Sequence, residues 1–216
     1  MSPSPALASL FPFPVPPDYK WSNKYTLMRA GETEKESKNV MESNAMFMTN
    51  RVEGNIMTGR GVGQVEESIK ILRQHPPTII KHPLSASAID ASNMISTSLH
   101  LGRDRVVPEF TFMDPRGCGL YNGLPLNSAS LGLLALDRDG SEVPGTQDGT
   151  PAEGLADVAC RLRQMMSVLE TQYGGEDILL VFSDGVTGGV MKAAMEGREL
   201  ADGWIVEMEQ GEVWVD

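Results

Sequence analysis

Two charged side chains stand at the ends of short apolar runs. The run 25–29 (YTLMR) ends in Arg29 and enters a Gly-Glu-Thr turn, and the run 178–182 (ILLVF) is followed by a turn that contains Asp184. Short apolar runs bounded by turn residues predict buried strands. In open α/β sheets, ligands bind beyond the carboxyl ends of the strands. Arg29 and Asp184 are therefore candidates for holding a charged ligand.

Other chemically capable residues have simpler structural explanations. The glycine-rich stretch 59–63 (GRGVG) lacks the preceding strand and the Gly-Lys-Ser/Thr ending of a phosphate-binding loop, so it indicates a helix start. His75 and His100 each follow a predicted helix, where a histidine complements the helix dipole. Cys118 and Cys160 form no Cys-x-x-Cys pair and predict neither a zinc site nor a disulfide framework. We expect no metal and no cofactor.

The elements that position these residues follow from apolar spacing. Apolar residues recur three and four positions apart in four segments and predict helices after Thr58, over 89–101, from 151 to Gly174 and around 191–195. Strands are expected at 25–29, 78–81 and 178–182, with a closing strand or hairpin at 203–215. Alternating strands and helices predict a three-layer α/β/α sandwich with a mostly parallel central sheet.

Two segments lack this periodicity. Residues 1–20 are predicted to be an extended, proline-rich N-terminal arm that packs, if at all, through Leu10, Phe11 and Phe13. Residues 108–150 are rich in Gly, Pro, Asn and Asp and are predicted to be a loop or lid insertion. The folded domain is expected to span 21–216.

Charge and composition exclude several function classes. The 216 residues carry 18 Lys plus Arg against 29 Asp plus Glu, a formal net charge of −11, which disfavours nucleic acid as a partner. No apolar stretch is long enough for a membrane span. The acidic cluster Glu32, Glu34 and Glu36 is interpreted as a solvated face, and the 13 methionines as gap-filling core residues or, alternatively, an adaptable partner surface.

Six segments, in order, resemble the motifs of the histidine phosphatase (phosphoglycerate mutase-like) superfamily. The segment 25–34 (YTLMRAGETE) resembles the strand and Arg-His-Gly-Glu turn that open its fold. The remaining five are 57–64 (MTGRGVGQ), 82–86 (HPLSA), Glu109 with 119–123 (GLYNG), 151–153 (PAE) and 180–185 (LVFSDG). Each motif is weak alone, and the resemblance lies in their order. It implies the superfamily's three-layer fold.

The resemblance implies a pocket that has lost most of its chemistry. The superfamily's reaction uses a nucleophilic histidine, two arginines and a second histidine around the phosphoryl oxygens, and an acid for the leaving oxygen. Arg29 is retained, and Glu109 stands where the acid is expected. The replaced positions are Ala30 for the nucleophile, Ala86 for the second arginine and Asp184 for the second histidine. One cation would then face two carboxylates, with interactions of about 4 kcal/mol per close pair in a half-buried site. We expect this pocket to reject phosphate.

Three further expectations concern the same positions. Thr33 is the nearest hydroxyl to the lost nucleophile, with no identifiable base. An ion pair between Arg29 and Asp184 would satisfy the retained arginine. A one-residue shift of the alignment would place Ser87, in place of Ala86, at the second arginine position.

The sequence therefore favours a catalytically inactive histidine-phosphatase-like protein that acts as an interaction or assembly module with a protein partner. One alternative is a phosphomonoesterase or phosphosugar mutase with a rearranged site that uses Arg29 and Glu109. Another is a small-molecule sensor whose cleft takes a cation-bearing ligand near Asp184 and Glu109.

The cellular location is less constrained. The two cysteines favour a reducing compartment, and the N-terminal residues lack the charged start of a secretory signal. These residues are rich in Ser, Ala and Pro, like the end of an organelle transit peptide, but lack arginine. The chain resembles the histidine-lacking phosphoglycerate mutase-like proteins of plants and algae, some of which are plastid proteins. That resemblance leaves a chloroplast location open.

Overall fold

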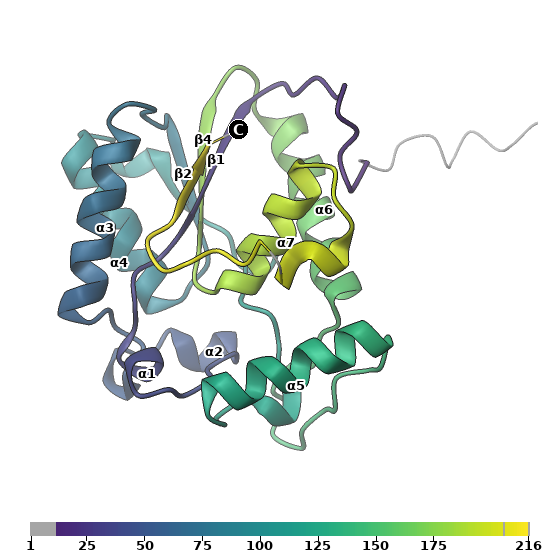
Figure 1. The fold of residues 1–216 in the computed structure, drawn as a ribbon. Coiled ribbons are helices and arrows are strands. Elements are labelled where there is room, and N and C mark those ends of the chain that lie inside the picture. The colour runs from purple at the N-terminus through teal and green to yellow at the C-terminus, as the bar shows by residue number, and fades with distance from the viewer. Residues whose placement is uncertain (1–11, 205, 216) are drawn as a thin grey trace, which may run out of the picture.

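The computed structural model describes residues 12–204 and 206–215, which are built around one central sheet (Figure 1). Its strands are β1 (Lys24–Arg29), β2 (Ile79–His82), β3 (Val106–Pro108), β4 (Asp177–Phe182) and β5 (Val213–Val215). Their order across the sheet is β3-β2-β4-β1-β5, and all neighbours are parallel except β5, which runs antiparallel to β1. The carboxyl ends of β1 to β4 therefore meet at one edge.

Alternating side chains on β4 fill two separate cores. Ile178, Leu180 and Phe182 point into one core, while Leu179 and Val181 point into the other. Successive residues of a strand face opposite sides of a sheet, so a fully apolar strand must be covered on both sides. Helices α6 (Leu155–Gln172) and α7 (Gly185–Met195) cover one face, and α3 (Gly59–Leu72) and α4 (Ala86–Leu99) cover the other (Figure 1). The predicted three-layer sandwich is confirmed.

The helices largely match the expected segments. They are α1 (Glu34–Ser37), α2 (Ala45–Met48), α3 (Gly59–Leu72), α4 (Ala86–Leu99), α5 (Leu126–Asp139), α6 (Leu155–Gln172) and α7 (Gly185–Met195). Short 3₁₀ turns occupy Arg51–Glu53, Arg103–Arg105, Gly119–Tyr121 and Leu200–Trp204. Thr58 caps α3 by accepting from the Gly61 N–H at 3.0 Å, and His100 is the C-cap of α4. Helices α4 and α7 begin earlier than predicted, within a few residues of the ends of β2 and β4, respectively.

The prediction that 108–150 is all loop was wrong. Residues 126–139 form α5, whose buried side is made by Ala129 and Leu133. Leu126 and Leu136 lie in the same helical rows, but this stripe is narrow and is flanked by Gly and Pro. Because Gly and Pro on both sides of this stripe indicate a loop, the helix was not predicted from the sequence. Strand β3 was also missed because a three-residue strand carries almost no pattern of its own.

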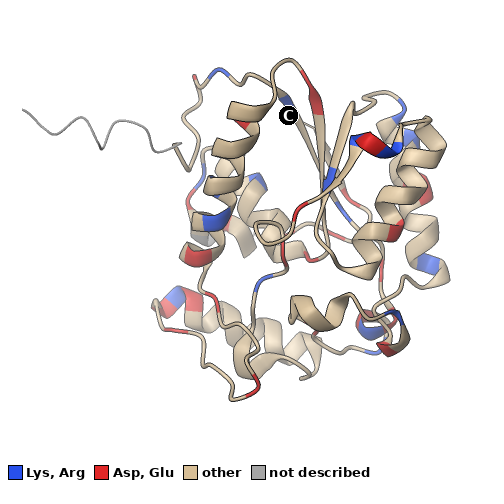
Figure 2. Cartoon of the chain, turned by 180° about the vertical axis from the view of Figure 1, so that it is seen from behind, with Lys and Arg blue, Asp and Glu red and all other residues tan. Residues whose placement is uncertain are grey.

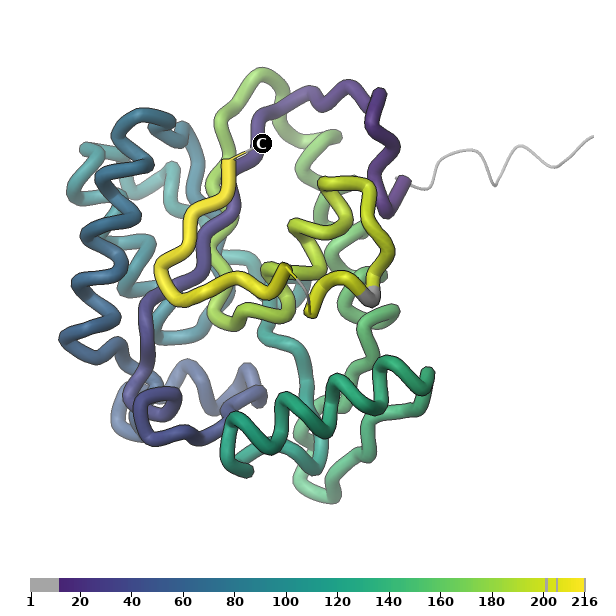
Figure 3. The backbone as a smooth tube through the Cα atoms, in the orientation of Figure 1, coloured from purple at the N-terminus to yellow at the C-terminus, as the bar shows by residue number. Residues whose placement is uncertain are grey.

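The N-terminal and C-terminal segments both pack on α7. The Val15 N–H donates to the Ala194 carbonyl at 2.8 Å, and Phe13 packs against the core, as expected of the arm. Leu10 and Phe11 lie outside the described residues. After α7 the chain returns across the molecule to β5, as the yellow tube in Figure 3 shows. The predicted closing strand thus forms, but its partner is β1 and there is no hairpin.

Charged residues are spread over many elements, with Lys and Arg scattered among Asp and Glu (Figure 2). Several ion pairs are exposed, such as Lys70–Glu67 and Lys38–Glu34. None of the helices in the described part of the chain has the length and apolar character needed to cross a bilayer.

One buried ion pair fixes α5 to the rest of the domain. The Arg116 guanidinium donates two hydrogen bonds to Asp137, from Nη1 to Oδ2 at 2.6 Å and from Nη2 to Oδ1 at 2.7 Å. The Trp204 Nε1–H donates to the same Oδ2 at 2.6 Å. The two charged side chains are 2% and 6% exposed. Asp137 therefore joins the loop before α5, α5 itself and the turn at Trp204.

Replacing Asp137 by alanine should destabilise the protein strongly. The change leaves the Arg116 guanidinium buried without its carboxylate, which costs about 3–5 kcal/mol. Urea unfolding followed by circular dichroism would measure this loss. Asp139→Ala on the same helix is the control, since Asp139 is exposed and should cost no more than about 0.5 kcal/mol. Equal losses in the two variants would contradict the assigned role of Asp137.

Candidate functional site

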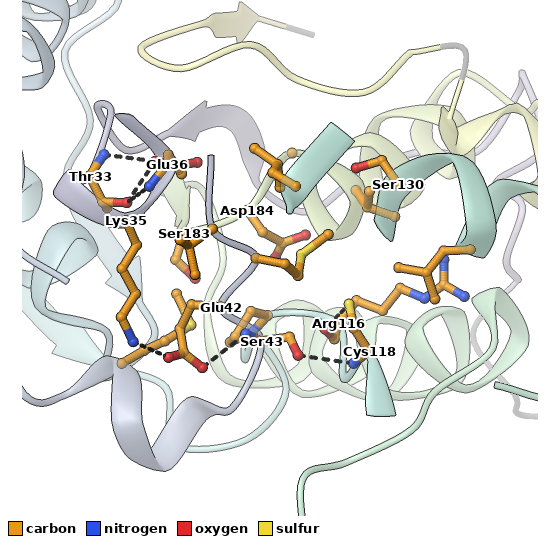
Figure 4. A pocket seen from close by; sticks show the side chains of 18 of the residues that line it. Thr33, Lys35, Glu36, Glu42, Ser43, Arg116, Cys118, Ser130, Ser183 and Asp184 are labelled. Carbon is orange, nitrogen blue, oxygen red and sulfur yellow. Dashed lines mark hydrogen bonds and ion pairs between the residues drawn. The ribbon is translucent and has the colours of Figure 1, made fainter. Parts of the chain in front are cut away.

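A pocket of about 70 Å³ lies where β1 and β4 end (Figure 4). Arg29, the last residue of β1, and Ser183 and Asp184, which follow β4, line one side. The remaining wall comes from α1, α2, α5 and the loops that join them, from the start of α7 and from the C-terminal segment that carries Trp204 and Glu207. Its apolar part consists of Val40, Met41, Met48, Leu126, Leu133, Val186 and Trp204. The volume is far below the roughly 300–1,000 Å³ of drug-sized sites, so only a small ligand would fit in this conformation.

The turn after β1 is held against the start of α3 by direct backbone contact. A Cβ added at Gly31 would lie 2.1 Å from the Gly61 carbonyl oxygen, and one added at Gly61 would lie 2.2 Å from the Glu32 carbonyl oxygen. The Thr58 N–H also donates to the Glu32 carbonyl at 2.9 Å. Only glycine permits this approach, which fixes the turn that begins at Arg29.

Two of the three guanidinium nitrogens of Arg29 donate hydrogen bonds. Nη2 donates to Glu36 Oε1 at 2.5 Å, and Nη1 donates to the Met208 carbonyl at 2.8 Å. The Arg29 and Glu36 side chains are 12% and 15% exposed. Arg29 Nε is buried without a hydrogen-bond partner. The predicted ion pair between Arg29 and Asp184 was wrong, because the chain supplies Glu36 as the carboxylate partner.

Asp184 instead caps helix α7. Its Oδ1 accepts from the Thr187 N–H at 2.7 Å, which satisfies an otherwise free donor of the first helical turn. Its Oδ2 is buried and has no hydrogen-bond partner among the described residues. The neighbouring Ser183 is 6% exposed, and its Oγ is also buried and unpartnered. Two polar atoms at the end of β4 thus remain unsatisfied beside the pocket.

Glu36 belongs to a capping box at the start of α1. Thr33 Oγ1 accepts from the Glu36 N–H at 3.2 Å, while Glu36 Oε2 accepts from the Thr33 N–H at 2.7 Å and from Thr33 Oγ1 at 3.0 Å. The interpretation of Glu32, Glu34 and Glu36 as a solvated face was therefore wrong for Glu36. It was also wrong for Glu32, whose side chain is 13% exposed and accepts from Thr58 Oγ1 at 2.9 Å. The spacing Thr-x-x-Glu is the signature of a capping box and could have revealed the role of Glu36 from the sequence.

The other two cations of the pocket are paired as well. Lys35 Nζ forms an ion pair with Glu42, whose Oε1 accepts from the Ser43 N–H at 3.1 Å, and Arg116 pairs with Asp137. Figure 4 shows Lys35 reaching down to Glu42 on one side and Arg116 lying beside Cys118. Each cation in the lining thus has a carboxylate of its own.

Glu207 is the remaining carboxylate of the lining. A Cβ added at Gly185 would lie 2.7 Å from Glu207 Cγ and 2.7 Å from Arg29 Nη1, so these groups crowd the start of α7. Burial raises the pKa of Glu207, and Asp184 and Glu36 raise it further, while Arg29 lowers it. The pKa of Glu207 is raised overall, because burial and the like charges of Asp184 and Glu36 outweigh the attraction of Arg29.

The five positions taken from the sequence motifs do not all reach this pocket. Arg29 and Asp184 line it. Ala30 is 2% exposed and packs into the core on the α3–α4 face, and Ala86 is the buried first residue of α4. Glu109 follows β3, where its N–H donates to the His82 carbonyl at 2.8 Å. Ala86 and Glu109 stand at the same sheet edge, but not in the pocket lining.

His82 and Cys118 lie near the site, and both side chains are buried. His82 ends β2, is buried, and its Nδ1 lies 2.8 Å from the Pro83 carbonyl oxygen. Burial lowers its pKa, so it is neutral at pH 7. Cys118 lines the pocket, and burial raises the pKa of its thiol to about 11. In the described part of the chain, no three His, Cys, Asp or Glu side chains are grouped to hold a metal ion.

Comparison with known proteins gives matches at the level of structure. No protein-family model and no curated protein sequence matches the chain. Among solved structures, the mycobacterial glucosyl-3-phosphoglycerate phosphatase Rv2419c in complex with VO3 superposes with a TM-score of 0.69 at 18% identity, over 88% of this chain and 90% of that one.

Two further matches are phosphatases. The phosphoserine phosphatase of Entamoeba histolytica in complex with 3-phosphoglyceric acid gives a TM-score of 0.67 at 16% identity, and the alpha-ribazole phosphatase of Shigella flexneri gives 0.65 at 16% identity. Each alignment covers 88% of both chains. These neighbours are histidine-phosphatase-family proteins, and identities this low support a common fold. The chain described here has the phosphoglycerate mutase-like fold that those phosphatases share.

Proposed function

We propose that this chain is a non-catalytic protein of the phosphoglycerate mutase-like fold, and that the fold serves as an interaction or assembly module. The observation that carries the proposal is the pairing of Arg29 with Glu36. A phosphoryl group would need that guanidinium, and a carboxylate of the same chain already occupies it at 2.5 Å. To bind phosphate, the pocket would have to break a hydrogen-bonded ion pair that is mostly shielded from water.

The charge of the pocket supports the proposal. Its three cations are each paired with a carboxylate, and Asp184 and Glu207 add negative charge beside Arg29. Two charges 4 Å apart interact by about 4 kcal/mol at the effective dielectric constant of such a site. A phosphate dianion would therefore meet net repulsion.

The available nucleophiles support it as well. The residue after Arg29 is Ala30, whose methyl group cannot attack phosphorus. Thr33 Oγ1 accepts from the Glu36 N–H as the cap of α1 and donates to Glu36 Oε2. This carboxylate, which the sequence did not indicate as a base for Thr33, is already paired with Arg29. The Cys118 thiol remains protonated at neutral pH because burial raises its pKa to about 11.

An interaction role is supported by apolar side chains exposed on the segments that close the pocket. Met46 and Phe47 on α2 are 81% and 48% exposed, and Leu131 on α5 is 69% exposed. Leu120 and Leu124, before α5, are also exposed. Exposed apolar side chains gathered on one part of a fold commonly mark protein-binding surfaces. The partner, and the chloroplast location that the N-terminal residues leave open, remain predictions.

The native chain should not hydrolyse phosphomonoesters. A panel that includes 3-phosphoglycerate, phosphoserine and p-nitrophenyl phosphate, followed by release of inorganic phosphate, tests this. A variant with Asp184→His and Glu36→Gln adds a histidine to the pocket lining and frees Arg29, and it should bind vanadate more tightly than the native chain does. Turnover by the native chain that Arg29→Ala abolishes would favour the alternative, a phosphomonoesterase or phosphosugar mutase with a rearranged site.

The two cysteines should differ sharply in reactivity. Cys160 is exposed, whereas the pKa of buried Cys118 is raised from 9.0 to about 11, which lowers its thiolate fraction at pH 8 by about a hundredfold. A thiol reagent at pH 8 should modify one cysteine rapidly and the second only after unfolding. Cys160→Ser is the control, since it should abolish the rapid phase. Rapid modification of Cys118 in the folded protein would reopen its role as a nucleophile.

The exposed apolar side chains of α2 and α5 should contact the partner. A photo-crosslinking amino acid placed at Phe47 or Leu131 should give a discrete adduct in the source cells. The matched control is Val168, an exposed apolar position on α6, which is not one of the segments that close the pocket. Equal labelling at all three positions, or none at Phe47 and Leu131, would count against the interaction role.

A further inference from the structure

We propose that the pocket at the ends of β1 and β4 binds a small primary ammonium compound with a short hydrocarbon body. The inference rests on the proposed non-catalytic role, because it uses the same pocket with Arg29 already paired. It names the chemistry of a ligand that would replace the phosphoryl group.

The first argument is the balance of charge in the lining. Arg29, Lys35 and Arg116 are paired with Glu36, Glu42 and Asp137, respectively. Asp184 and Glu207 have no ion pair in the described residues, although Arg29 lies near enough to lower the pKa of Glu207. Partly buried Asp184 and the exposed residue Glu207 thus exceed the cations of the lining, and a cationic ligand would compensate them.

The second argument is the set of unsatisfied atoms. Asp184 Oδ2 and Ser183 Oγ are buried without hydrogen-bond partners, and Ser183 is 94% buried and lines the pocket. Figure 4 shows Ser183 and Asp184 side by side in the pocket wall. A buried acceptor without a partner is destabilising, so a donor that reaches both atoms would recover the lost hydrogen bonds.

The helix start at α7 does not supply this donor. Its Thr187 N–H is already taken by Asp184 Oδ1, which leaves Oδ2 free for a second partner. Glu207 is brought close by packing against Gly185, where a Cβ would meet its Cγ at 2.7 Å. An ammonium group has three N–H donors, and Asp184, Glu207 and Ser183 offer three acceptors around the start of α7.

The third argument is the apolar remainder of the lining. Met41, Met48, Leu133 and Val186 face the same cavity, and none of these side chains can solvate a second charge. A metal ion is a poorer fit, because in the parts of the chain the structure describes no group of three His, Cys, Asp or Glu side chains could hold one. The lining therefore suits one charged end and a few carbon atoms, in about 70 Å³.

The test is a titration of the full chain with n-propylammonium chloride at pH 7 and constant ionic strength, followed by ¹⁵N–¹H NMR. Propionate and n-propanol match the probe in size and remove or reverse its charge. We expect saturable shifts at Gly185 and Ser43 with n-propylammonium and none with the other two compounds. Equal responses to all three, or no saturable response, would overturn the inference.

Variants separate a built site from diffuse attraction to an acidic protein. Asp184→Asn keeps a good helix cap while removing the charge, and Glu207→Gln removes the second carboxylate. Each should weaken n-propylammonium binding at least tenfold. Asp157→Asn, a matched change in the first turn of α6 outside the pocket, should leave binding unchanged. Equal affinity in all variants would contradict the site.

The outcome is independent of the test of the proposed function. Hydrolysis of phosphomonoesters by the native chain would overturn the non-catalytic role and this inference with it. An inactive chain that also fails to bind n-propylammonium would overturn only the ammonium site.

Discussion

The guanidinium of Arg29 connects the segments of the chain that form the site. It joins the end of β1 to α1 through Glu36 and to the C-terminal segment through the Met208 carbonyl. The same group also packs closely against the start of α7. This approach is possible because residue 185 is glycine, since a Cβ there would lie 2.7 Å from Arg29 Nη1. A charge that is mostly shielded from water must be satisfied by partners, and here all of the partners come from the chain itself. The pocket is consequently shaped by internal pairing around one retained arginine.

Strand order explains which motif residues reach this pocket. β1 and β4 are neighbours, so Arg29 and Asp184 stand side by side at the sheet edge. β2 is two strands away from β1 and β3 is three, and at about 4.8 Å per strand Glu109 is displaced by about 14 Å. Small side chains at Ala30 and Ala86 leave the intervening space to the hydrophobic core. The fold that those phosphatases share is therefore present here with a pocket on the β1–β4 side.

The two hydrophobic cores that flank the sheet are separate from the charged groups of the site. The two cores are built from alternating residues of the strands and from the inner sides of α3, α4, α6 and α7. None of the pocket carboxylates belongs to either core. Substitutions at the sheet edge can therefore change the ligand from an anion to a cation, provided that each buried charge finds a partner. Arg29, Lys35 and Arg116 each have such a partner, whereas Asp184 has no ion pair in the described residues.

The sequence by itself determined the layered architecture, because apolar period and turn residues are local properties. The runs at β1 and β4, the helix after Thr58 and the long helix before Gly174 were all evident from spacing. The positions of Arg29 and Asp184 at strand ends were evident as well. Helix α5 and strand β3 were missed, since one lies among Gly and Pro and the other has three residues.

Only the tertiary structure decided which charges meet. Glu36 rather than Asp184 pairs with Arg29, and Glu207, 178 positions from Arg29 in sequence, closes the same cluster. Glu36 carried a local signal in its Thr-x-x-Glu spacing, but Glu207 carried none. Its place follows from the path of the C-terminal segment over α7, which depends on close packing at Gly185 and Gly189. Pairing between buried charges is set by distance in space, and spacing along a chain specifies that distance only within a single element.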